Sequence, residues 1–153
     1  MSENKMAVAQ EESKSSQRRY AKQYLSQGYK IDLRINSKLE QIASLRSLAT
    51  KATGVLSDMP KGGSGSSSRM EEIVGKIVDL EAEINEDIKA LVDFKTEATR
   101  KIKLVDKPDY QTVLELRHLC YHSWEDISAE MHFSIPHLHT LHNAALVEFS
   151  KTL

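Results

Sequence analysis

Cysteine, long apolar runs and signal-peptide features are all scarce or missing in this sequence. Cys120 is the only cysteine, so no internal disulfide can form, as is usual for proteins of a reducing compartment. No window of about 18 residues is apolar enough to be a transmembrane helix, and residues 1–16 lack the apolar core of a signal peptide. We therefore expect a cytoplasmic protein that has no membrane partner.

Aromatic residues and prolines are few, which favours helices over a compact mixed fold. Apolar residues recur at intervals of three and four over residues 20–53 and, more strictly, over residues 70–103, where only Asp87 interrupts the heptad pattern. A helix of about 34 residues is a rod of roughly 50 Å, too long to bury its own apolar face. We predict an all-α fold with a disordered tail over residues 1–19 and a long antiparallel, coiled-coil-like hairpin over residues 20–107.

Glycine and serine are concentrated in one tract, Gly-Gly-Ser-Gly-Ser-Ser-Ser at residues 62–68. This composition is typical of a flexible linker, natural or engineered, and is not expected to continue a helix. The prediction is a flexible hairpin tip at residues 54–69. A short hinge at residues 105–108 then leads to a separate segment, residues 108–153.

Three short helical patterns fill residues 110–149. Ser123 and Ser134 stand where N-caps belong, because a serine oxygen can accept an unpaired amide of the first helical turn. His132 is expected to take a left-handed conformation in the turn between the last two helices, at a cost of about 1 kcal/mol relative to glycine. The apolar faces of the three helices are predicted to be Val113, Leu116 and Cys120; Trp124, Ile127 and Met131; and Ile135, Leu138, Leu141, Ala145 and Phe149.

A set of these residues has the spacing of a known DNA-binding module: Val113-Leu114, Leu116-Arg117, Ser123-Trp124, Asp126-Ile127, Ser134, Leu138, Leu141 and Ala145-Leu146. Through them, residues 108–153 resemble the helix-turn-helix of sigma-factor region four and, more closely, phage late-transcription regulators of the RinA/ArpU-like group. Residues 51–60 also resemble proteins of this group. The resemblance implies a DNA-binding activator of late genes that acts with bacterial RNA polymerase in the host cell.

The predicted recognition helix has no lysine or arginine before Lys151. Its candidate contacts to double-stranded DNA are polar: Ser134, His137, His139, Thr140 and Asn143, joined by Arg117 from the first short helix. Thr140 and Asn143 can read base edges, Ser134 can meet a phosphate, and imidazole charge is adjustable near neutral pH.

Charge is unevenly distributed along the chain. Residues 108–153 contain two basic side chains against six acidic ones, so this segment alone should bind DNA weakly. Residues 1–69 contain twelve basic side chains against six acidic ones, and Arg18, Arg19 and Lys22 are candidate phosphate contacts. A run of basic side chains of this kind is more often a solvated face than a binding patch.

All six histidines lie between His118 and His142. His118 and His122 are four apart, and His139 and His142 three apart, spacings that can bring two imidazoles to one metal ion. Other candidate ligands are scattered over three helices and Cys120 has no second cysteine, so we expect neither a metal site nor a cofactor. His118 and His122 are instead expected at the edge of the core. No nucleophile, base and oxyanion donor can be assembled, which argues against an enzyme.

Two other functions remain open. The acidic segment can be a protein-interaction module that binds polymerase or another protein without touching DNA, or the chain can be a structural coiled-coil protein. In each case the long helices are expected to join copies of the chain or to hold a partner. Steep salt dependence of binding to duplex DNA would distinguish a DNA-binding regulator from these two alternatives.

Overall fold

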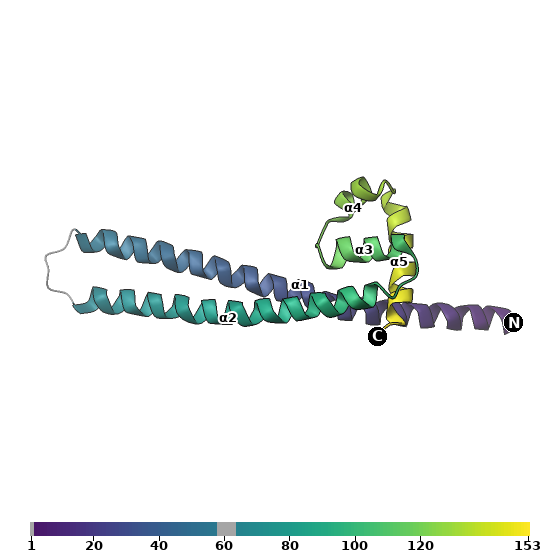
Figure 1. The fold of residues 1–153 in the computed structure, drawn as a ribbon, viewed down its shortest axis with the longest axis horizontal. Helices are drawn as coiled ribbons and strands as arrows, with labels where there is room; N and C mark the ends of the chain where they lie inside the picture. Colours follow the sequence, from purple (N-terminus) through teal and green to yellow (C-terminus); the bar gives the residue numbers. More distant parts are fainter. Residues whose placement is uncertain (1, 58–63) are drawn as a thin grey trace. The chain divides into compact units, whose positions relative to one another are not determined.

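The computed structural model describes residues 2–57 and 64–153, and every regular element in these ranges is an α-helix (Figure 1). The elements are α1 (Ser2–Ser57), α2 (Ser64–Ile102), α3 (Pro108–His118), α4 (Trp124–Met131) and α5 (Ile135–Ser150). The predicted all-α class is confirmed. The chain divides into two units: Ile31–Leu91 forms one, and the residues up to Lys30 form the other together with Val92–Leu153.

In the unit Ile31–Leu91, α1 and α2 pack side by side along the predicted apolar seam. Ile35, Ile42 and Ile84 are buried in it, and Ile31, Ile77, Leu80 and Leu91 pack against them. Leu39 was expected in the same seam but is 50% exposed. Ion pairs join Arg34 to Asp87 and Arg46 to Glu81, so residue numbers rise along one helix as they fall along the other. The two helices of this unit are therefore antiparallel.

Asp87, the residue that interrupts the heptad pattern, is an inter-helix ion-pair partner. Its carboxylate lies 2.6 Å from Nζ of Lys38 and 3.5 Å from the guanidinium of Arg34. The hydrogen bond from Lys38 is the main reason that the pKa of Asp87 is lowered. A charge at a seam position is tolerated here because two cations of the facing helix compensate it.

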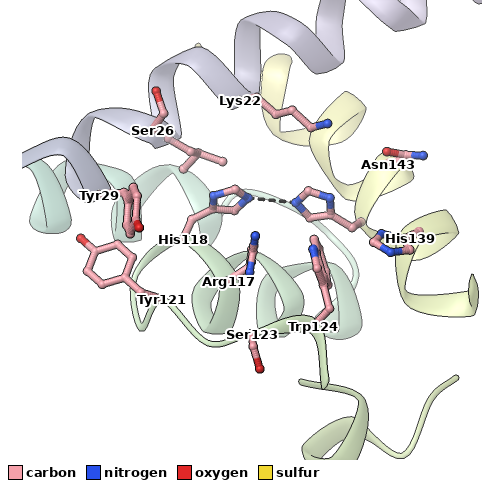
Figure 2. A pocket seen from close by; sticks show the side chains of 12 residues that line it. Lys22, Ser26, Tyr29, Arg117, His118, Tyr121, Ser123, Trp124, His139 and Asn143 are labelled. Atoms are coloured by element: carbon pink, nitrogen blue, oxygen red, sulfur yellow. Dashed lines mark hydrogen bonds between the residues drawn. The ribbon is translucent and has the colours of Figure 1, made fainter. Parts of the chain in front are cut away.

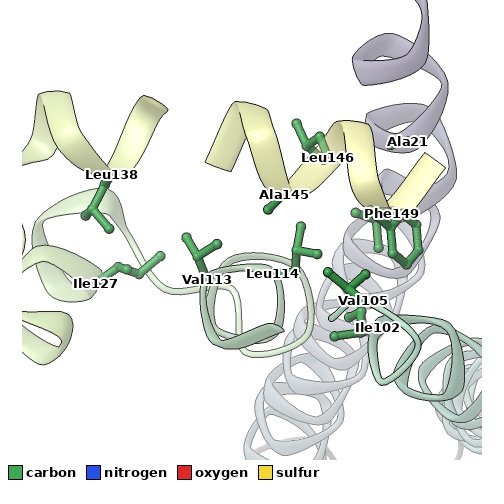
Figure 3. Close-up of a cluster of buried hydrophobic side chains, with 11 residues drawn as sticks. Ala21, Ile102, Val105, Val113, Leu114, Ile127, Leu138, Ala145, Leu146 and Phe149 are labelled. Atoms are coloured by element: carbon green, nitrogen blue, oxygen red, sulfur yellow. The ribbon is translucent and has the colours of Figure 1, made fainter. Parts of the chain in front are cut away.

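The other unit has its own apolar core, to which all five helices contribute (Figure 3). Ala21 and Leu25 come from α1 and Ile102 from α2, and the rest come from Val105 and the three short helices: Val113, Leu114, Ile127, Leu138, Ala145, Leu146 and Phe149. Gly28 permits a close approach between α1 and the Phe94 ring of α2. A Cβ atom added to it would lie 2.5 Å from Cε1 of Phe94 on α2.

The predicted caps and turn of the short helices are confirmed. Ser123 Oγ accepts a hydrogen bond from the amide of Asp126 at 3.2 Å, and Ser134 Oγ accepts one from the amide of His137 at 3.3 Å. His132 ends α4 in the left-handed conformation, with φ 59° and ψ 37°.

The predicted disordered tail over residues 1–19 is wrong, because α1 extends back to Ser2. Besides four serines, this stretch consists largely of alanine, glutamate, glutamine, lysine, arginine and methionine, and it contains no glycine or proline, so intrinsic propensity favours the helix. The side chains of residues 2–14 are exposed, so propensity is the main support for this part of α1.

The predicted flexible tip is too long. Residues 54–57 belong to α1 and residues 64–69 to α2, so the serines after Gly65 continue a helix. Residues 58–63 lie outside the described part of the chain. Serine costs a helix only a fraction of 1 kcal/mol per residue, so the apolar pattern that follows can extend α2 backward over this tract.

The placement of Cys120 and His122 also differs from the prediction. Helix α3 ends at His118, so both residues follow it, and Cys120 is exposed rather than part of the apolar face. Tyr121 has a positive φ of 60°, which reverses the chain before α4. His118 and His122 therefore do not share a helix.

None of the described helices combines the length and the apolar character that crossing a bilayer requires.

Candidate nucleic-acid interface

Helix α5 has one face in the core and one face in solvent. Leu138, Ala145, Leu146 and Phe149 are fully buried. The five polar residues predicted to contact DNA are all exposed: Ser134, His137, His139, Thr140 and Asn143. The structure therefore brings these predicted contacts together on the solvent side of a single capped helix.

Local contacts hold most of these side chains in place. The His137 ring packs against Phe133 with 4.7 Å between ring centroids, and the His139 ring packs against Trp124 at 4.8 Å. The Thr140 hydroxyl donates to the carbonyl of Pro136 at 3.2 Å. The Asn143 amide has no hydrogen-bond partner among the described residues, so its donor and its acceptor both remain available.

A cavity of about 760 Å³ opens beside this face (Figure 2). It is lined from four helices, by Lys22 of α1, Arg117 of α3, Trp124 of α4 and Asn143 of α5 among others. The cavity thus brings one N-terminal cation, Lys22, to the same place as predicted contacts of α3 and α5.

The other two candidate phosphate contacts on α1 do not line this cavity. Arg18 is paired with Glu11 of its own helix at 3.2 Å. Arg19 is exposed. Of the three N-terminal cations singled out from the sequence, only Lys22 therefore joins the candidate interface.

Arg117 is anchored on both sides. Its guanidinium donates to the carbonyl of His122 at 2.9 Å, and its Cζ atom lies 4.6 Å from the centre of the Trp124 ring. Neither Arg117 nor Lys22 is in an ion pair within residues 2–57 and 64–153, so both positive charges remain uncompensated by a carboxylate there.

A histidine pair forms part of the cavity wall. His118 and His142 approach with their Nε2 atoms 2.9 Å apart, and one nitrogen donates to the other according to the tautomers. The pKa of His118 is lowered to about 4 and that of His142 to about 3; burial is the main cause, and the nearby charges of Arg117 and Lys22 contribute to both shifts. Both imidazoles are therefore neutral at neutral pH.

His118 lies at the edge of the core, as expected, but His142 is only 5% exposed, which was not predicted. Its position could have been found from the sequence, because residue 142 falls on the stripe formed by Leu138, Ala145 and Phe149. His122 lies elsewhere, with Nδ1 3.1 Å from a carboxylate oxygen of Glu130. Within the described residues, no three histidine, cysteine, aspartate or glutamate side chains are grouped closely enough to hold a metal ion.

Comparison with protein-family models, with curated proteins and with solved structures finds no match to this chain.

Proposed function

We propose that the protein is a DNA-binding transcription regulator that places α5 in a groove of double-stranded DNA. The observation that carries this proposal is the exposed polar face of α5, where the capping residue Ser134 and four side chains after it are able to contact DNA. The resemblance of residues 108–153 to sigma region four and to phage late regulators supports the same function. By that resemblance it would activate late genes with bacterial RNA polymerase, in the cytoplasm of the host cell.

Phosphate attraction has to come from outside α5, because its exposed face contains no lysine or arginine. Lys22 and Arg117 lie beside that face, because they line the same cavity as Asn143. With so few cations, contacts to base edges by Thr140 and Asn143 would have to supply much of the affinity for a specific site.

The long helices would hold a second copy of the chain. The unit Ile31–Leu91 keeps Leu33, Leu39 and Leu48 of α1 and Val74, Val78 and Ile88 of α2 exposed, and a homo-oligomer would cover such side chains. Two copies would also double the number of DNA contacts.

The test begins with selection of bound fragments from a pool of randomised duplexes, followed by fluorescence anisotropy at two salt concentrations. Thr140→Ala and Asn143→Ala should each cost about 1–3 kcal/mol on the selected site and little on random duplex. Thr96→Ala is the matched control, because Thr96 is also exposed and its hydroxyl also bonds the carbonyl four residues earlier, that of Val92. It should leave binding unchanged.

Lys22→Gln should instead weaken both duplexes alike and reduce the salt slope by about one. If no duplex is selected even at low salt, or if Thr96→Ala weakens binding as much as Thr140→Ala, the proposal is wrong.

The second candidate is a protein-interaction module that binds polymerase without contacting DNA. The excess of acidic over basic side chains in residues 108–153 favours it. In that case polymerase would retain the protein on a column while duplex DNA of any sequence would not.

A further inference from the structure

We propose that the cavity between α1, α3, α4 and α5 is a phosphate-binding pocket that takes the phosphate group of a nucleotide. The group can come from a free mononucleotide or from a DNA strand, and the chemistry that recognises it is the same. The pocket deepens the proposed DNA-binding function in the second case only. In the first case it stands independently of that function.

Two uncompensated cations are the main argument. Lys22 and Arg117 line the cavity from different helices, and its lining contains no aspartate or glutamate. Figure 2 shows them on either side of the hydrogen-bonded histidine pair. Two positive charges that share a cavity repel each other, so a bound anion would offset that repulsion.

The rest of the lining supplies the neutral donors that a phosphate also needs. Ser123 contributes a hydroxyl group, and the Asn143 amide is without a partner in the described structure. Ser26 also lines the cavity, and its hydroxyl donates to the carbonyl of Gln23 at 2.9 Å. Arg117 is restrained by its contacts with Trp124 and the carbonyl of His122, so little side-chain entropy remains to be lost on binding. A planar guanidinium held in this way is suited to phosphate recognition.

The size of the cavity fits a nucleotide rather than an ion alone. Its volume of about 760 Å³ lies within the range of small-molecule sites, roughly 300–1,000 Å³. Tyr29, which is 50% exposed, forms part of the wall. This ring offers a surface against which a base can pack.

A metal ion is the weaker reading of the same histidines. His118 and His142 already satisfy each other at 2.9 Å, and the nearest fixed charges, those of Arg117 and Lys22, are positive. Those charges oppose a cation and favour an anion.

Fluorescence of Trp124 gives a direct test, because it is the only tryptophan and it lines the cavity. The full chain is titrated with thymidine 5′-monophosphate, with inorganic phosphate and with thymidine. The monophosphate should give a saturable change, and thymidine should bind about tenfold more weakly or not at all, as expected for loss of one charge-assisted contact.

Lys22→Gln should also weaken the monophosphate about tenfold, and Lys22→Arg should restore it. Lys30→Gln is the matched control, since Lys30 is an exposed lysine of the same helix that does not line the cavity. Equal weakening by Lys30→Gln, equal binding of thymidine, or no saturable change at millimolar nucleotide would each overturn the pocket.

Competition with duplex DNA separates the two sources of phosphate. If the monophosphate displaces a bound duplex, the pocket holds a DNA phosphate; if it binds without displacing the duplex, the ligand is a free nucleotide. Nucleotide binding in the absence of any duplex binding supports the pocket while contradicting the proposed DNA-binding function. Duplex binding without any nucleotide binding would support the proposed DNA-binding function and contradict the pocket.

Discussion

The Nε2 atoms of His118 and His142 lie 2.9 Å apart and join α3 to α5 through a single hydrogen bond between two neutral imidazoles. The contact needs one ring to accept, so it is lost when both rings are protonated. The positive charges of Lys22 of α1 and Arg117 of α3 favour the neutral form of both rings, and the neighbouring His139 acts on His142 in the same direction. The pair is therefore an acid-sensitive link between the two helices.

Stability should fall as the pH is lowered through the acidic range. The pKa values of His118 and His142 in the folded protein, about 4 and about 3, lie below the ordinary value of 6.5. The unfolded chain thus binds more protons than the folded one at intermediate pH. The contribution is fully present above about pH 6.5 and is lost as the pH falls through about 4 for His118 and about 3 for His142, with a slope of up to about 1.4 kcal/mol per pH unit for each histidine.

Chemical denaturation at several pH values measures this slope. Carboxylates also titrate at the acidic end, so the comparison needs a variant. His142→Leu should flatten the slope between pH 6.5 and 5, whereas His137→Gln, which removes an exposed imidazole of the same helix, should not. Parallel curves for the wild type and His142→Leu would contradict the assignment.

Gly28 of α1 and Gly75 of α2 should respond in opposite ways to replacement by alanine. At Gly28 the added methyl group meets the Phe94 ring at 2.5 Å, and overpacking of this kind costs about 1–3 kcal/mol, more than the helix-propensity gain of at most about 1 kcal/mol. At Gly75 nothing lies within 4 Å, so alanine should stabilise by about 0.5–1 kcal/mol. Thermal melts of both variants check the prediction, and a stabilised Gly28→Ala protein would refute the close packing.

Asp87 should matter because of its partners, not because of its charge alone. Asp87→Asn leaves Lys38 without the carboxylate 2.6 Å away and should lower the melting temperature. Glu83→Gln removes a carboxylate that is 57% exposed and 3.7 Å from the same ammonium, and should change the melting temperature little. The double variant Lys38→Met/Asp87→Leu should recover the melting temperature that Asp87→Asn loses. A melting temperature that stays low in the double variant would show that the ion pair has another role.

Each serine cap should contribute about 1 kcal/mol to stability. Ser123→Ala and Ser134→Ala remove the oxygens that accept the amides of Asp126 and His137. Ser47→Ala, an exposed change within α1, should be neutral or slightly stabilising because alanine is the better helix former. Equal melting curves for all three variants would show that the caps are not needed.

Much of the fold follows from local rules that a single sequence contains. The apolar intervals predicted the two long helices and the three short ones, and the positions of Ser123, Ser134 and His132 predicted the helix boundaries of α4 and α5. The exposed residues of α5 followed from the same periodicity, since a residue that is off the apolar stripe faces solvent.

The remaining features depend on contacts between distant segments. Helix α3 ends at His118, and the left-handed conformation that follows it is taken by Tyr121. Glycine or asparagine would have indicated such a conformation in the sequence, but tyrosine does not. The approach of Lys22 to the helices of residues 108–153 depends on the packing of Ala21 and Leu25 in their core. The cavity could not be predicted, because it needs α1 to lie against a segment almost a hundred residues later. The histidine pair could not be predicted either, because it depends on how α3 packs against α5.

The exposed position of Cys120 makes the cavity accessible to chemical labelling. One maleimide reaction attaches a dye or a spin label to the only thiol of the chain, in the loop next to the cavity-lining Tyr121. The same thiol can join two chains by a disulfide in air, so any measurement of self-association has to be made under reducing conditions. A covalent dimer formed in this way would otherwise be mistaken for one held by the long helices.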